Sequence, residues 1–176
     1  MGILVAVDLS KSTEKVVKQV EVLGKALSAK VWLLHVAEPE PEFVGFDNAA
    51  KYIRDARSEL FHNEHRQIQA IADRLRKAEL EATALLVQGF MADCILHEAA
   101  KLNVKLIVLG SHGHGNIYDF LVGSVSEAVL HKATCPVLIV PTHERESSDP
   151  MPPVLPHGRI ETSSSASCKH AVLNRF

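Results

Sequence analysis

Short apolar runs alternate with longer amphipathic stretches over the first 141 residues, and this alternation constrains the fold more than any other feature. The runs are rich in β-branched residues, as in strands buried on both faces of a sheet. The stretches between them repeat apolar residues every three or four positions, as in helices that pack on a sheet. We expect strands at residues 3–7, 30–36, 83–88, 104–109 and 136–140, and helices at 13–27, 47–78, 92–102 and 124–132.

Strands that alternate with helices favour a parallel sheet with crossover connections. The sequence therefore predicts an α/β fold, a five-stranded doubly wound parallel sheet of order 3-2-1-4-5 with helices on both faces. Ligands of such sheets bind beyond the carboxyl ends of the strands where the order reverses, here between the first and fourth strands. Asp8 ends the first strand and Gly110 follows the fourth, so we expect both at that point.

The long helix expected at 47–78 carries one apolar stripe, with charged residues between its members. We interpret those charges as a solvated face. The stripe comprises Ile53, Ala56, Leu60, Ile68, Ile71 and Leu75.

The composition changes after residue 141. Four of the eight prolines lie within 150–156, and a serine-rich run follows at 162–167. Such segments do not bury enough apolar surface to form a core. We expect one domain over 1–141 and a flexible Pro/Ser-rich tail over 142–176.

The formal net charge of −2 gives no electrostatic reason to expect a nucleic-acid partner. We expect no membrane insertion, since no apolar run approaches the roughly 18 residues that a membrane helix needs. The three cysteines are widely spaced, as in reduced proteins, and we expect a cytoplasmic location.

The most distinctive segment is a glycine-rich loop from Gly110 to Ser124. We expect Gly110 and Gly113 to take positive φ and to let the backbone approach a ligand closely. Gly123 and Ser124 stand where the next helix begins, and the free N–H groups of a helix start suit a phosphate. The spacing by itself fits a second interpretation equally well, in which the loop is only a turn and Ser124 caps the helix.

This segment resembles the nucleotide-binding signature of the universal stress protein family, Gly-x2-Gly-x9-Gly-Ser/Thr. Gly110, Gly113, Gly123 and Ser124 match it with unbroken spacing. The resemblance covers residues 1–141 and includes Leu34-His-Val36 and the run 135–140. It implies the ATP-binding type of the family, whose members keep these glycines.

The resemblance also implies roles for particular residues. Asp8 would lie near the ribose and phosphates, although it could instead be structural and cap the turn at Ser10. The backbone of Val36 would meet the adenine. The remaining expected nucleotide contacts are Gly110, Gly113, Gly123, Ser124, Val125 and, more weakly, Ser126. The family pairs its fifth strands across an interface, which implies a homodimer through strand 136–140, whose apolar edge needs cover.

Residues 106–131 contain no Lys or Arg, so the charge of ATP must be offset by other groups. We expect Mg²⁺ to be required for tight binding, and hydrolysis to be slow or absent because fast phosphoryl transfer uses cations on the developing charge. The expected function is an ATP-binding regulator that modulates a partner in stress response or transport. The alternative is a slow ATPase or an autophosphorylating phosphotransferase. A response-regulator receiver is disfavoured, because Gln88 stands where that fold needs a phosphate-accepting Asp.

Overall fold

The computed structural model describes residues 1–39, 48–111 and 123–142, and for 48–54 it describes the backbone alone. These residues belong to one compact unit, Met1–Glu144. Gly113, much of the glycine-rich loop and the expected tail beyond residue 142 lie outside the described residues.

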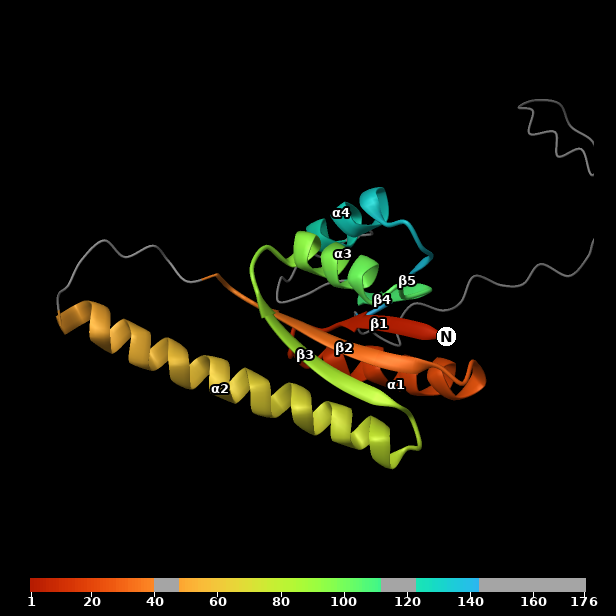
Figure 1. Cartoon of the computed structure of the whole chain (residues 1–176), viewed down its shortest axis with the longest axis horizontal. Coiled ribbons are helices and arrows are strands. Elements are labelled where there is room, and N and C mark those ends of the chain that lie inside the picture. Colours follow the sequence, from red (N-terminus) through yellow and green to blue (C-terminus); the bar gives the residue numbers. More distant parts are fainter. Residues whose placement is uncertain (40–47, 112–122, 143–176) are drawn as a thin grey trace, which may run out of the picture. The chain divides into compact units, whose positions relative to one another are not determined.

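Five parallel strands form one sheet of order β3-β2-β1-β4-β5, which confirms the predicted topology (Figure 1). β1 lies in register with β2 from Gly2 opposite Lys30, and with β4 from Ile3 opposite Leu106. The strand order changes direction between β1 and β4, so this is the switch point of the sheet. The strands are β1 (Gly2–Ala6), β2 (Lys30–Ala37), β3 (Ala82–Gln88), β4 (Leu106–Gly110) and β5 (Val137–Val140).

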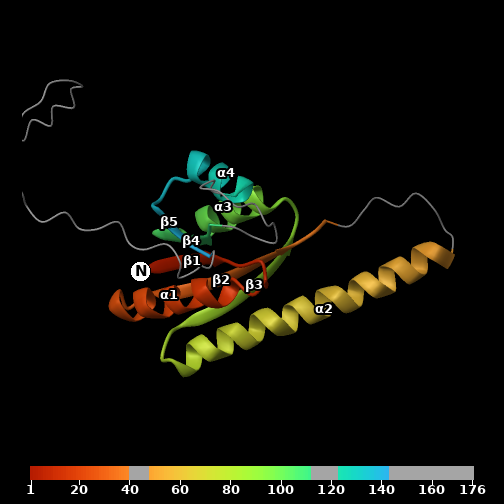
Figure 2. The same cartoon turned by 180° about the vertical axis from the view of Figure 1, so that it is seen from behind.

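Two helices cover each face of the sheet, α1 and α2 on one side and α3 and α4 on the other (Figures 1 and 2). All four helices lie within two residues of the predicted positions. They are α1 (Thr13–Ala26), α2 (Asn48–Lys77), α3 (Met91–Lys101) and α4 (Ser124–Lys132).

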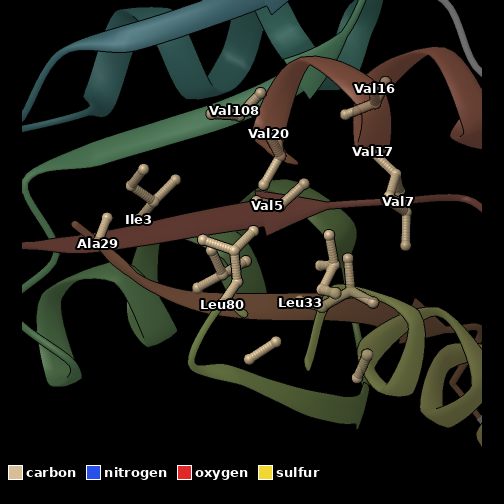
Figure 3. Close-up of a cluster of buried hydrophobic side chains, with 14 of the residues drawn as sticks. Ile3, Val5, Val7, Val16, Val17, Val20, Ala29, Leu33, Leu80 and Val108 are labelled. Atoms are coloured by element: carbon tan, nitrogen blue, oxygen red, sulfur yellow. The ribbon is translucent and has the colours of Figure 1, made fainter. Parts of the chain in front are cut away.

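Successive residues of β1 point to opposite faces of the sheet, as the pleat requires. Ile3 and Val5 pack with Val17 of α1 in one buried cluster (Figure 3), while Leu4 packs with Ile95 of α3 in the other. A strand with both faces covered must be apolar at every position, which explains why β1 reads as a continuous apolar run rather than an alternating one.

The apolar stripe of α2 is only partly buried. Ile68 and Leu75 are fully buried against the sheet, but Leu60 is 56% exposed and Ala56 is also exposed. Both views show the N-terminal half of α2 extending past the carboxyl end of β2 (Figures 1 and 2). That half has no sheet beneath it, so Ala56 and Leu60 have no core to enter.

None of the helices in the described ranges is long and apolar enough to cross a membrane.

Candidate functional site

A cavity of about 980 Å³ lies at the carboxyl end of the sheet, at the upper end of the size range of small-molecule pockets. The ends of β1, β2 and β4 form its floor, and residues of α2, α3 and the start of α4 form its walls. The cavity therefore stands at the switch point that the strand order predicts. Of the expected site residues, it brings together Asp8, Val36, Gly110, Gly123, Ser124, Val125 and Ser126.

Asp8 has a structural role as well as a place on the cavity wall. Its Oδ1 accepts a 3.0 Å hydrogen bond from the Ser10 N–H and a 3.1 Å hydrogen bond from the Thr13 hydroxyl. Because Thr13 begins α1, this carboxylate fixes the turn between β1 and that helix. The same side chain lines the cavity, so the two interpretations of Asp8 are compatible.

Gly110 does not take the positive φ that we expected. Gly89 is the only glycine of the described ranges with a positive φ, at 148°. Gly110 instead ends β4 and pairs with Val140 of β5, and this pairing keeps its backbone extended. Glycine is therefore useful at position 110 because it places no side chain at the cavity floor.

The start of α4 provides backbone N–H groups to the cavity. The first hydrogen bond of the helix runs from the Glu127 N–H to the Gly123 carbonyl and is 2.9 Å long. Ser124, Val125 and Ser126 precede it, and the N–H groups of a first turn have no acceptor within their own helix. All three residues line the cavity, where these groups and the helix dipole favour an anion.

The serines of this helix start differ in their surroundings. Gly123, not Ser124, occupies the N-cap position and makes no side-chain cap bond, so the interpretation of Ser124 as the cap is wrong. Ser124 is the first helical residue and is exposed. The buried Ser126 hydroxyl donates a 3.0 Å hydrogen bond to the Gly110 carbonyl, which ties α4 to the end of β4.

Ser111 connects the glycine-rich loop to the end of β5. Its N–H donates to the Val140 carbonyl over 2.8 Å, and its carbonyl accepts a 2.9 Å hydrogen bond from the Gly123 N–H. The second bond joins the two residues that border segment 112–122. Lys15 of α1 reaches the same region, since its Nζ donates to the Thr142 carbonyl over 2.9 Å.

His35 is buried at the end of β2 and lines the cavity beside Val36. Its Nδ1 lies 2.8 Å from the Val7 carbonyl, to which it donates, and its Nε2 lies 3.7 Å from Oε1 of Glu64 on α2. The Nδ1 hydrogen bond makes His35 a satisfied residue of the rim, and the position of Glu64 brings α2 close to the sheet next to Asp8.

Sequence reasoning missed the contribution of α2 and α3 to the cavity. Arg57, Phe61 and Glu64 of α2 and Met91 and Ile95 of α3 all line it. One signal in the sequence could have indicated this. The helical pattern of α2 continues for a greater length than the strand β2 before it. From the sequence, the charged positions of α2, which include Arg57 and Glu64, are interpreted as a solvated face, and no role is assigned to Phe61, Met91 or Ile95.

The charged residues that line the cavity within the described ranges are three carboxylates and one guanidinium. They are Asp8, Glu38, Glu64 and Arg57. No three His, Cys, Asp or Glu side chains of those ranges gather as a metal site. A phosphate ligand would therefore bring its negative charge beside described lining residues that carry more acidic groups than basic ones.

The family model of the universal stress protein family matches residues 1–141. A universal stress protein of Thermus aquaticus is 33% identical over 141 residues, which cover 78% of this chain and 96% of that protein. The solved structure of MJ0577 from Methanocaldococcus jannaschii matches with a TM-score of 0.70 and 27% identity, over 82% of this chain and 97% of that one. A universal stress protein of Archaeoglobus fulgidus, solved in complex with dAMP, shares the fold with a TM-score of 0.56 and 21% identity, over 80% and 97% of the chains.

Proposed function

Because this chain belongs to the universal stress protein family, we propose that it binds an adenine nucleotide, ATP together with Mg²⁺, in the cavity at the carboxyl end of its sheet. Nucleotide occupancy then modulates the interaction of the chain with a protein partner in stress response or transport. The observation that carries this proposal is the convergence of the ends of β1, β2 and β4 with the first turn of α4 on one cavity.

Each wall of the cavity suits one part of the nucleotide. The end of β2 at Val36 would meet the adenine, and Asp8 and Gly110 would lie near the ribose. The N–H groups of Ser124 and Val125 would bind the phosphates, as the start of a helix does for anions. Gly123 would lie beside the phosphates, with its own N–H donated to the Ser111 carbonyl. Ser126 would act by holding α4 on β4 through its hydrogen bond to Gly110. Gly113, the remaining residue of the signature, lies outside the described residues and stays a prediction.

Mg²⁺ is part of the proposal because the cavity is acidic. Three carboxylates and one guanidinium among the described lining residues give no net positive charge to balance a triphosphate. Mg²⁺ is commonly held by substrate phosphates and one or two carboxylates. Asp8, at the end of β1, is the residue that we propose beside the metal. The ion would neutralise phosphate charge.

Adenine is the proposed base because a member of the family with this fold has been solved with dAMP. The cavity also provides apolar surface next to Val36 from α2 and α3. The domain would comprise residues 1–141, and residues 142–176 would form the tail. We further propose a cytoplasmic location, and a homodimer that forms through the strand at 136–140, since β5 is an edge of the described sheet.

A slow phosphotransfer is the alternative function. Ser124 is exposed on the cavity wall, whereas the Ser111 hydroxyl is bonded to Thr142. Transfer of the γ-phosphoryl group of ATP to the Ser124 oxygen would release ADP and a proton. Labelled ATP separates binding from a slow ATPase and from a phosphotransferase. Covalent label that is lost in Ser124→Ala would indicate phosphotransfer, labelled inorganic phosphate without labelled protein would indicate hydrolysis, and neither product would indicate binding alone.

Calorimetric titration with ATP and Mg²⁺ tests the proposal directly. We expect micromolar binding by the natural chain, and its loss in a Gly113→Ala, Ser124→Ala double variant. A Ser58→Ala variant provides the control, because Ser58 also lines the cavity but lies on α2, away from the proposed phosphate cradle. Absence of ATP binding by the natural chain would overturn the proposed function and leave the family assignment intact.

A further inference from the structure

We propose that α2 provides a base-stacking wall to the cavity, with Phe61 as the ring on which a purine base stacks and Arg57 as the group beside it. This inference rests on the proposed nucleotide-binding function and deepens it. It assigns the recognition of the base to a helix outside the glycine signature, in addition to the backbone of β2.

Two polar contacts orient this face of α2 toward the end of β2. Arg57 Nη1 donates to the Pro39 carbonyl over 3.3 Å, and Glu64 Oε1 lies 3.7 Å from His35 Nε2. Phe61 lies between Arg57 and Glu64 on the helix, at spacings of four and three, so the three residues share one face. The ring is therefore held on the side of α2 that faces the end of β2.

The wall opposite α2 is also apolar where the base is expected. Met91 and Ile95 of α3 line the cavity together with Val36 of β2. Phe61 carries the only phenyl or indole ring among the described lining residues. In the proposed complex the base would lie between the Phe61 ring and these aliphatic groups, because every base has a π-face that can stack.

The surroundings of Phe61 indicate a ligand contact rather than a core contact. Phe61 is half-buried, belongs to neither of the two buried clusters of the described residues, and neighbours the exposed Leu60. An apolar ring that lines an open cavity gains buried surface when a ligand covers it.

The position of Arg57 in the fold places it at the base rather than at the phosphates. Its anchor, the Pro39 carbonyl, follows β2, whereas the start of α4 is tied to β4 through Ser126 and Gly110. β2 and β4 are separated by β1, and two strand spacings amount to roughly 10 Å. A nucleotide that has its phosphates at α4 would present its base to Arg57, whose planar guanidinium stacks on rings and donates hydrogen bonds.

The test compares Phe61→Ala with Phe90→Ala. Phe90 is the matched control, since it is 75% exposed at the start of α3 and does not line the cavity. Titration with adenosine, AMP and Mg-ATP should show an affinity loss of about tenfold or more in Phe61→Ala. The loss should be equal for the three ligands, because they share the base and differ in phosphates. Phe90→Ala should bind all three as the natural chain does.

Two further variants make the result specific to an aromatic ring. Phe61→Leu, which keeps apolar bulk, should lose affinity, whereas Phe61→Trp should retain it and show a fluorescence change with adenosine.

Arg57→Gln should lower all three affinities equally, while Arg66→Gln, at an exposed position that does not line the cavity, should not. Thermal unfolding of each variant shows that it is folded.

The outcomes separate this inference from the proposed function. If the natural chain binds none of the three ligands, the proposed function fails and this inference fails with it. If the natural chain binds them and Phe61→Ala binds them equally well, the inference alone is overturned. A loss that grows with the number of phosphates would also overturn it, since the ring would then act at the phosphate end.

Discussion

The hydroxyl oxygen of Ser111 lies 3.2 Å from the Thr142 hydroxyl and accepts a 3.1 Å hydrogen bond from the Thr142 N–H. Ser111 borders the glycine-rich loop, and Thr142 follows β5. The contact therefore joins the end of the proposed ligand site to the strand that we propose as the dimer edge. A change at the loop and a change at the edge are expected to affect each other through this pair.

A double-mutant cycle measures that coupling. Ser111→Ala removes the acceptor of the Thr142 N–H and should lower the free energy of unfolding by about 1–2 kcal/mol. Thr142→Val removes the Thr142 hydroxyl alone. Both changes interrupt one contact. The cost of the double variant in unfolding free energy should therefore differ from the sum of the two single costs by about 0.5 kcal/mol or more. Chemical denaturation of the four proteins provides the values, and strictly additive costs would show that the two residues act independently.

Ser126 and Ser124 should separate stability from affinity. Ser126→Ala removes a buried hydrogen bond to Gly110 and should lower the unfolding free energy by about 1 kcal/mol, equivalent to about 2–4 °C in a chain of this size. Ser124→Ala changes an exposed residue, so it should leave the unfolding temperature unchanged. It should weaken ATP binding, because it removes a hydroxyl that we propose as a donor to a phosphate oxygen beside the backbone N–H groups. Calorimetry of unfolding and of binding on both variants checks this. The reverse pattern would contradict the assigned roles.

Removal of Mg²⁺ should weaken ATP binding about tenfold or more, because the described cavity wall has a single cation against three carboxylates. AMP carries less charge and should be affected less. Asp8→Asn should reduce the difference between the ATP affinity measured with Mg²⁺ and the ATP affinity measured with chelator. Equal ATP affinity with and without chelator would argue against a metal at this site.

Cys94 should react slowly with alkylating agents at neutral pH. Burial, followed by the charges of Asp93 and Glu98, raises the pKa of its thiol, and the thiolate is the reactive form. Its alkylation rate should therefore rise only at a higher pH than the rate of an unperturbed cysteine does. Asp93→Asn removes one negative charge and should raise the rate at a given pH. Iodoacetamide labelling in a Cys135→Ser, Cys168→Ser background measures this.

The same raised pKa has a defined effect on stability. A thiol that holds its proton more tightly in the folded state than in the unfolded state stabilises the fold at pH values below the unfolded pKa. This contribution is lost as the pH rises through the folded pKa. Stability should fall with increasing pH in the alkaline range, and by less in Cys94→Ala. An identical alkaline profile for both proteins would contradict the expectation.

Local patterns were sufficient to predict the elements and the strand order. Fully apolar runs such as Ile3–Val5 are compatible only with a strand covered on both faces, and crossover connections leave few topologies for five such strands. The position of the site followed, because the ends of the first and fourth strands meet at the switch point. Asp8 and Gly110 were located in this way without any knowledge of contacts.

Conformation at single residues was less predictable. A positive φ at Gly110 was wrong because pairing with Val140 outweighs the local freedom of glycine. The cap at Ser124 was wrong by one residue, as helix ends commonly are. In both cases an interaction between segments distant in sequence decided a property that the local sequence leaves open.

The sequence by itself determined the strands, their order, the family signature and the acidic balance of the chain, because each depends on residue type and spacing along the chain. Tertiary structure alone decided that α2 lies beside the cavity and brings Arg57, Phe61 and Glu64 to it. Helical periodicity identifies which residues share a face, but it does not identify what that face meets. Here the sheet ends before the helix does, so one face of α2 covers core at Ile68 and lines an open cavity at Phe61.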